Sequence, residues 1–243
     1  MIGAGSRAMV TGGGVRLGRE IALTLARAGV NVCIHYGSSE EAAQQTLEEV
    51  REFGVDATAV QADLRDPVTA ADQMFECVAE VFGAVDILIN NAAIFEPGSL
   101  DETDESAWDR HLDINLKAPF FLTQRFARQL ASGHDGAVVN IIDWRASRPR
   151  PGHAAYTIAK GGLLTMTRLL ALELAPRIRV NAVSPGAILP PPGSDNEYLQ
   201  QLAGKIPLQR TGSPAQVTDA VMFLLRSDFL TGEVVQVTGG EHL

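Results

Sequence analysis

The sequence Thr11-Gly12-Gly13-Gly14-Val15-Arg16-Leu17-Gly18 lies between a short apolar run and an amphipathic helical pattern. The apolar run, Ala8–Val10, predicts a strand, and the pattern that follows predicts a helix over Arg16–Ala28. Glycines in such a turn let backbone amides approach a pyrophosphate at the positive end of the helix. A flexible turn that binds nothing would have the same composition. The stretch therefore predicts a dinucleotide-binding α/β fold, to be weighed with the rest of the chain.

Short apolar runs alternate with helical patterns along the whole chain. Runs such as Asp86-Ile-Leu-Ile-Asn90 are apolar on consecutive positions, as strands are when helices cover both faces of a parallel sheet. We therefore expect one doubly wound, Rossmann-like α/β domain spanning residues 1–243, with seven strands and right-handed crossovers. The expected strands are Ala8–Val10, Val30–His35, Val55–Gln61, Val85–Asn90, Ala137–Ile142, Arg177–Val183 and Val234–Val237. The expected helices are Arg16–Ala28, Ser39–Phe53, Pro67–Phe82, Ser106–Ser132, His153–Ala175 and Pro214–Leu225.

One segment, from Ala187 to Pro207, interrupts this alternation. It contains three consecutive prolines, Pro190–Pro192, followed by Gly193. Long irregular connections in compact domains are usually lids or binding loops. We therefore expect residues 187–207 to form a substrate-binding loop.

The composition excludes several classes of protein. The chain has 243 residues and a net charge of -9, and no long basic run offers a surface for nucleic acid. No uncharged apolar run reaches the length of a membrane span, and the N-terminus does not resemble a signal peptide. We expect a cytoplasmic protein with no metal site, in which Cys33 and Cys77 are buried thiols and not a disulfide.

The end of the second strand indicates which dinucleotide is bound. Enzymes that select NAD usually have a carboxylate there, but this chain reads His35-Tyr36-Gly37-Ser38-Ser39, with no acid before Glu40. The two serine hydroxyls and the Arg16 guanidinium suit a phosphate, which favours NADP(H). One serine can equally be the N-cap of the next helix. Asp63 can accept a hydrogen bond from an adenine amino group or cap the helix that begins near Pro67.

Tyr156 and Lys160 stand four residues apart in a predicted helix, so they project from one face. An ammonium beside a phenol favours the phenolate and makes the hydroxyl a usable acid or base. Asp143 precedes Tyr156 by thirteen residues, and its charge opposes Lys160 and holds the phenol nearer its neutral form. We treat the three as one coupled unit, although a helical tyrosine is most often a packing residue.

Five motifs occur in the order typical of the short-chain dehydrogenase/reductase family, and the chain resembles that family over essentially its whole length. Besides the glycine loop, they are Asn90-Asn91-Ala92-Ala93, Asn115 within Asp113-Ile-Asn-Leu, Tyr156-Thr-Ile-Ala-Lys160 and Asn181-Ala-Val-Ser-Pro185-Gly186. The resemblance implies a homotetramer in which the helices Ser106–Ser132 and His153–Ala175 contact other subunits. It also implies that Asn115 interrupts its helix and holds a water connecting Lys160 to solvent.

Three departures from the common family pattern resemble its pteridine reductase branch. Arg16 replaces a middle glycine, Asp143 replaces a serine, and Phe95 follows the Asn-Asn-Ala-Ala turn. The branch resemblance implies that Phe95 and the nicotinamide sandwich a pterin, and that Arg16 contacts both cofactor and substrate. Ala93 lacks the hydroxyl often found there, and His153 stands where a tyrosine can line the pocket.

The site residues expected from these arguments are as follows. The catalytic residues are Asp143, Tyr156, Lys160 and Asn115. The cofactor-binding residues are Gly12, Gly14, Arg16, Leu17, Gly18, His35, Tyr36, Ser38, Ser39, Asp63, Leu64, Asn91, Ala92, Ala93, Tyr156, Lys160, Pro185, Gly186 and Ile188. The substrate-binding residues are Arg16, Phe95, Asp143, Tyr156 and Leu189.

Asp143 also bears on the reaction. A serine would donate a hydrogen bond to a substrate carbonyl, whereas an ionised aspartate cannot donate and would repel a developing alkoxide. This favours proton delivery to a ring nitrogen, hence reduction of dihydropterins or dihydrofolate by NADPH. Alternatives are reduction of ketones or 3-oxoacyl groups, and an NADP(H)-binding sensor without turnover. Asp143 can also be an inactivating change or form a salt bridge to Arg145 or Arg148. Arg145, Arg148 and Arg150 are interpreted as a solvated loop or a subunit contact, with contact to an anionic substrate tail such as a folate glutamate as the alternative.

Overall fold

The computed structural model describes residues 3–130, 133–191 and 196–243, and it is built around a parallel sheet of seven strands. The strand order is β3-β2-β1-β4-β5-β6-β7, so the chain reverses direction across the sheet between β1 and β4. The doubly wound, Rossmann-like fold predicted from the sequence is confirmed. The strands are β1 (Arg7–Val10), β2 (Asn31–Tyr36), β3 (Ala57–Gln61), β4 (Ile87–Asn90), β5 (Gly136–Ile141), β6 (Ile178–Pro185) and β7 (Val234–Val237).

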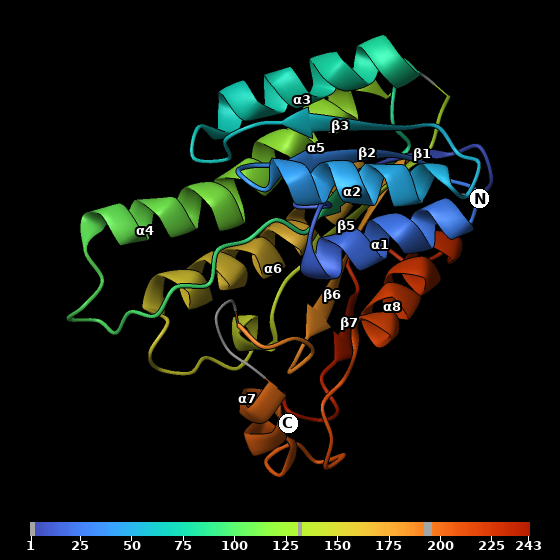
Figure 1. Cartoon of the computed structure of the whole chain (residues 1–243). Coiled ribbons are helices and arrows are strands. Elements are labelled where there is room, and N and C mark those ends of the chain that lie inside the picture. The colour runs from blue at the N-terminus through green and yellow to red at the C-terminus, as the bar shows by residue number, and fades with distance from the viewer. Residues whose placement is uncertain (1–2, 131–132, 192–195) are drawn as a thin grey trace.

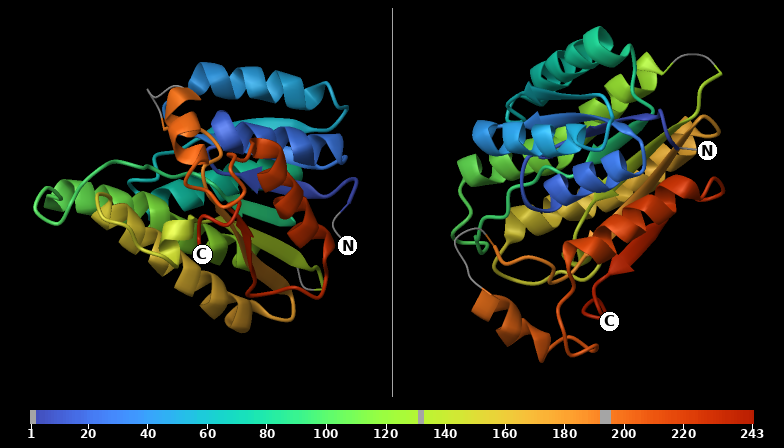
Figure 2. Two further views of the ribbon diagram at one scale, coloured as in Figure 1. Left: turned by 90° about the horizontal axis from the view of Figure 1, so that it is seen from below. Right: turned by 45° about the vertical axis from the view of Figure 1, so that its right-hand side comes forward.

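Helices cover both faces of this sheet (Figures 1 and 2). One layer consists of α1 (Arg16–Arg27), α2 (Glu40–Arg51) and α8 (Pro214–Arg226). The other consists of α3 (Pro67–Phe82), α5 (Ala118–Gln129) and α6 (Ala154–Leu174). In β1, Ala8 and Val10 face the first layer and Met9 faces the second, which explains the apolar residues at consecutive positions.

The predicted helix Ser106–Ser132 is divided into three parts. It consists of α4 (Glu105–Leu112), a π-helical turn η1 (Asp113–Lys117) and α5, with Asn115 at the centre of the turn. The expected interruption at Asn115 is therefore present. Residues 131 and 132, where the prediction ended, lie outside the described residues.

The segment 187–207 contains a helix, α7 (Asn196–Ala203), which the prediction of an irregular loop did not include. The run of prolines and Gly193 that suggested irregular backbone ends inside residues 192–195, which lie outside the described part. Figure 1 shows α7 beyond the end of β6, at the same end of the molecule as the C-terminus. Ligands bind outside the carboxyl ends of the strands in sheets of this kind, so α7 borders the region where a site is expected.

Among the residues described, no helix combines the length and the apolar character needed to cross a bilayer. Within the same residues, no group of three or more His, Cys, Asp or Glu side chains could hold a metal ion. Cys33 and Cys77 are free thiols, the first buried as expected and the second only half-buried.

Candidate active site

The glycine loop is packed tightly against the helix that follows it. Gly12 has a φ of +61°, a conformation that side-chain-bearing residues rarely adopt. A Cβ on Gly18 would lie 2.0 Å from the carbonyl oxygen of Gly12, so only glycine allows α1 to begin this close to the loop. The loop backbone is thereby held at the N-terminal end of α1, where an anion is favoured.

Two side chains, those of His35 and Thr11, form hydrogen bonds that hold this loop in place. His35 Nδ1 accepts a hydrogen bond from the Gly12 N–H at 3.1 Å, so its Nε2 donates to the carbonyl of Ala62, also at 3.1 Å. Burial lowers the pKa of His35 to about 4, which keeps the ring neutral with these roles. We expected His35 to bind the cofactor, but its ring is buried and both nitrogens are used by the backbone.

Thr11, which was not among the residues predicted from the sequence, also holds the glycine loop in place. Its hydroxyl accepts from the backbone N–H groups of Asn91 and Ala92, each at 2.9 Å. The Asn91 side chain in turn donates to the Thr11 carbonyl at 2.8 Å. The Asn-Asn-Ala-Ala turn is therefore joined to the glycine loop across β1 and β4.

The end of β2 has the character expected for a phosphate site. Ser38 and Ser39 are exposed, and Ser39 is the N-cap residue of α2, although its hydroxyl forms no capping hydrogen bond within the described chain. Arg16 is exposed at the start of α1 and donates to the carbonyl of Pro190. Its guanidinium thus connects the glycine loop with the segment before α7.

Several other residues predicted to bind the cofactor pack into the hydrophobic core. The side chains of Tyr36, Leu64 and Ile188 are buried in the hydrophobic clusters, so only their backbones can face a ligand. Leu17 is partly buried against the same core. Asp63 is exposed and paired with Arg65, and the N-cap residue of α3 is Asp66, so Asp63 is not the cap.

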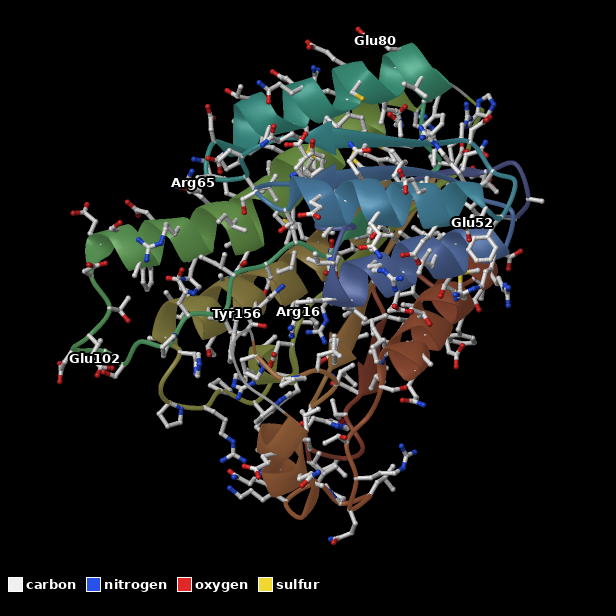
Figure 3. All side chains as sticks on the ribbon, viewed as in Figure 1. Arg16, Glu52, Arg65, Glu80, Glu102 and Tyr156 are labelled. Atoms are coloured by element: carbon white, nitrogen blue, oxygen red, sulfur yellow. The ribbon has the colours of Figure 1, made fainter. Side chains whose placement is uncertain are left out.

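Asp143, Tyr156 and Lys160 meet at the carboxyl end of β5. Tyr156 Oη donates a hydrogen bond to Asp143 Oδ2 at 3.1 Å. Lys160 Nζ donates to the carbonyl of Ile141 at 2.8 Å and lies 5.9 Å from the centroid of the Tyr156 ring. Figure 3 shows Tyr156 from α6 and Arg16 from α1 projecting toward the same end of the sheet.

These contacts determine the protonation of the phenol. Burial, followed by the charge and hydrogen bond of Asp143, raises the pKa of Tyr156 well above its usual value. Burial lowers the pKa of Lys160 to about 8, against the attraction of Asp143. In this arrangement burial and Asp143 favour the neutral phenol, against the phenolate that Lys160 alone would favour.

Phe95 is fixed among aromatic rings. It stacks on His153 with centroids 4.1 Å apart and meets the edge of Tyr156 at 4.7 Å. Its neighbour Ile94 donates to Asn115 Oδ1 and accepts from Asn115 Nδ2, each at 3.0 Å. On the other side, the Glu96 N–H donates to His111 Nε2 at 3.3 Å. The π turn and α4 thus position Phe95 through its two neighbours.

Arg145 lies at the site and not in a solvated loop, which was one of the alternatives expected from the sequence. Its guanidinium lies 3.5 Å from Asp143 Oδ1, 4.9 Å from the Trp144 ring centroid and 5.5 Å from that of Phe95. Its Nε is buried and has no hydrogen-bond partner among the described residues. The predicted salt bridge to Asp143 and the Tyr156 contact therefore exist together, one on each carboxylate oxygen. Arg148 and Arg150 are exposed, and Arg150 stacks on Trp144 at 5.7 Å.

A cavity of about 790 Å³ joins these groups. Among the predicted residues, its walls include Arg16, Ala93, Phe95, Asp143, Gly186 and Leu189. Leu199 and Leu202 of α7 and Glu241 also line it. The two leucines lie within the segment 187–207 that was predicted to bind substrate, whereas Glu241 was not predicted. Nothing in the sequence pattern pointed to Glu241, because the turn after β7 reaches the cavity only through the folding of the chain.

The chain is similar to known oxidoreductases in sequence and in fold. Residues 14–242 match the family described as enoyl-(acyl carrier protein) reductase. The chain is 36% identical to the 3-oxoacyl-(acyl-carrier-protein) reductase FabG of Staphylococcus aureus, over 97% of this chain and 98% of that protein. It is 34% identical to FolM alternative dihydrofolate reductase 1 from Brucella suis in complex with NADP, with a TM-score of 0.94 over 99% of this chain and 96% of that one. Acetoin dehydrogenase YohF from Salmonella typhimurium gives a TM-score of 0.89 at 31% identity, over 97% of this chain and 96% of that one.

Proposed function

Because the chain belongs to the short-chain dehydrogenase/reductase family, we propose that it uses NADPH to reduce dihydropterins, dihydrofolate included, to their tetrahydro forms. The observation that carries the proposal is the hydrogen bond from Tyr156 Oη to Asp143 Oδ2 in a cavity walled by Phe95. A carboxylate at this place supports proton delivery to a ring nitrogen and gives no donor to a carbonyl oxygen. The likeness to FolM alternative dihydrofolate reductase 1 gives further support.

The chain binds NADP(H), and the residues at the glycine loop fit this cofactor. Gly12 and Gly14 bear no side chain that would cover the loop, and the amides there lie at the N-terminal end of α1. Ser38, Ser39 and Arg16 are exposed and supply two hydroxyls and a cation for the 2′-phosphate. When bound, the cofactor supplies the hydride of the reaction.

In the proposed reaction a carbon–nitrogen double bond of the substrate gains hydride at carbon and a proton at nitrogen. Tyr156 delivers this proton, because its raised pKa keeps the phenol neutral and Asp143 orients its hydroxyl. Lys160, buried and bonded to Ile141, holds a positive charge beneath the phenol as the proton leaves. Tyr156 then regains a proton from Lys160, and a water at Asn115 is proposed to connect Lys160 to solvent, so that Lys160 recovers the proton it gave. Phe95, fixed by His153, supplies the flat wall against which the ring stacks.

A second candidate function is the reduction of 3-oxoacyl thioesters. It is favoured by the 36% identity to 3-oxoacyl-(acyl-carrier-protein) reductases over almost the whole chain. Arg145, beside Asp143, also offers N–H donors that a serine hydroxyl would otherwise provide for a substrate oxygen.

A panel of substrates separates the two functions. Purified protein is given NADPH with 7,8-dihydrobiopterin, 7,8-dihydrofolate or acetoacetyl coenzyme A, and absorbance of NADPH is followed. We expect kcat/KM to be highest for a dihydropterin or dihydrofolate. In Asp143→Ser we expect pterin turnover to fall at least tenfold and thioester reduction to rise. Faster reduction of the thioester by the unaltered protein would support the second function, and NADPH binding with no oxidation would indicate a sensor.

We also propose that the protein forms a homotetramer through the face made by α4, η1, α5 and α6. On α6, Ile158, Leu169 and Leu172 are 51%, 48% and 81% exposed, and their spacing puts them on one side of the helix. Trp108 on α4 and Phe120 on α5 are exposed as well. Exposed apolar side chains at such spacing are typical of subunit contacts.

A further inference from the structure

Glu241, in the turn after β7, places a second carboxylate in the cavity that Asp143 also lines. The turn after β7 brings it there: the Glu241 N–H donates to the Thr238 carbonyl at 3.1 Å, and Leu208 N–H donates to Gly239 at 3.1 Å. The side chain then reaches the loop after β6, where Glu241 Oε2 accepts from the Ala187 N–H at 3.1 Å. Both ends of this contact line the same cavity as Asp143 and Phe95.

The contact with Ala187 uses only one of the two carboxylate oxygens. Glu241 Oε1 has no hydrogen-bond partner among the described residues. Gly186 leaves room for Oε2, the oxygen that accepts from Ala187, since a Cβ on residue 186 would lie 2.5 Å from it. The carboxylate is half-buried and oriented by a backbone amide, and its second oxygen can accept a hydrogen bond from a ligand.

Burial and neighbouring charges act on Glu241 in opposite directions. Burial raises the pKa of Glu241, and Asp143 acts in the same direction. The hydrogen bond from the Ala187 N–H, Arg145 and Arg150 oppose this increase. The cavity therefore contains two carboxylates and, in Arg145 and Arg16, two guanidinium groups, together with the Phe95 ring.

We infer that Glu241 binds the 2-amino group of the pterin ring and so selects aminopyrimidine substrates, an inference that rests on the proposed function. The 2-amino-4-oxopyrimidine half of a pterin carries N–H donors at the amino group and at the adjacent ring nitrogen. A carboxylate accepts from both, whereas the carbonyl oxygens of a 3-oxoacyl thioester offer it no donor. Asp143 and Tyr156 serve the reducing end of the ring system, and Glu241 holds the other half.

The test compares two ring systems that differ in the group at C2 and in the hydrogen that this change places on N1. The ligands are 7,8-dihydropterin and 7,8-dihydrolumazine, which has a carbonyl in place of the 2-amino group. Binding to the complex with NADP⁺ is measured by titration calorimetry, so no turnover is required. In Glu241→Gln the amide oxygen can still accept from Ala187, and the amide NH₂ then faces the cavity as a donor.

We expect the unaltered protein to prefer dihydropterin, and Glu241→Gln to bind it about 10- to 100-fold more weakly while binding dihydrolumazine equally well or better. Glu241→Ala should bind the two rings with similar affinity, which tests the inference if the Gln variant folds poorly. Glu233→Gln, the same change just before β7, is the matched control and should leave both affinities unchanged.

Equal weakening of both rings in Glu241→Gln would show a structural role through Ala187 and overturn the inference. Unchanged dihydropterin binding in that variant would also overturn it, while the proposed function stood. If the unaltered protein bound no dihydropterin at all, the proposed function itself would fail. Melting temperature and NADPH affinity, expected to stay constant, show that each variant is intact.

Discussion

Single residues in this protein depart from the family pattern at points where the structure gives them contacts that the common residue could not make. Arg16 has a φ of +52°, in the left-handed region that glycine tolerates and other residues enter at a cost of about 1–2 kcal/mol. This explains why a glycine is usual there, and a strained arginine is consistent with a use for its guanidinium. Asp143 likewise provides two oxygens where a serine has one, and it divides them between Arg145 and Tyr156.

The pKa values of this group predict how activity depends on pH. Only the protonated ammonium of Lys160 stabilises the negative charge that develops on Tyr156 as it gives up its proton. The pKa of Lys160 is about 8, so the ammonium is present below pH 8 and lost above it. With saturating NADPH, kcat/KM for a dihydropterin should therefore be constant below about pH 8 and fall as pH rises through it. Tyr156 does not set this limit, since burial and Asp143 raise its pKa well above the usual value.

Asp143→Asn tests the assignment of this limit to Lys160. Asp143 raises the pKa of Lys160 against the effect of burial, so removing the charge should move the alkaline limit to lower pH. Asp101→Asn, on an exposed turn, is the control and should leave the profile unchanged. A limit that stays in place in Asp143→Asn would assign the titration to another group.

At the scale of elements, the catalytic helix and the aromatic wall are held together by short polar contacts between loops and helices. The segment after β4 joins the start of α6, where Gly98 accepts from the Ala154 N–H and donates to the Gly152 carbonyl, each at 2.8 Å. This pairing brings Phe95 against His153. The π turn contributes because its central residue, Asn115, reaches both backbone groups of Ile94. Such turns are frequent at functional sites.

Replacing Asn115 by Ala should weaken the binding of substrate more than the binding of cofactor. The change removes two hydrogen bonds from Ile94, so we expect a loss of about 1–3 kcal/mol in stability and a displaced Phe95. KM for dihydropterin should rise several-fold more than KM for NADPH, as measured by steady-state kinetics beside thermal melts. Asn31→Ala, which removes one exposed hydrogen bond to the Asp56 N–H, is the matched control. A loss of stability with an unchanged KM for dihydropterin would leave Asn115 without this positioning role.

At the scale of the whole molecule, the cavity is closed by parts of the chain that are far apart in sequence. Arg16 comes from the first helix, Asp143 from the middle of the chain and Glu241 from its end. The reversal of strand order between β1 and β4 creates the crevice, and α7 and the C-terminal turn border it beyond β6 and β7. The face formed by α4 and α6 lies on the outside of this arrangement, with its apolar side chains exposed.

The proposed tetramer predicts the behaviour of a charge placed on α6. Leu172→Glu should reduce the sedimentation coefficient to that of a smaller assembly, because a buried glutamate at a subunit contact is costly. The side chain is 81% exposed in the single chain, so the fold itself should be unaffected. Val81→Glu on α3, at a position 52% exposed, is the control and should leave the assembly unchanged. A tetramer that persists in Leu172→Glu would place the contact elsewhere.

The sequence by itself determined the alternation of strands and helices, the glycine loop and the spacing of Tyr156 and Lys160. These depend on local geometry, since side-chain period and turn preference act within a few residues. Only the tertiary structure decided which contacts these groups make, because those depend on packing: Tyr156 is buried and donates its hydrogen bond to Asp143, while Lys160 donates to Ile141. The arrival of Arg145 and Glu241 in the cavity was likewise decided by packing across distant segments, which no local pattern encodes.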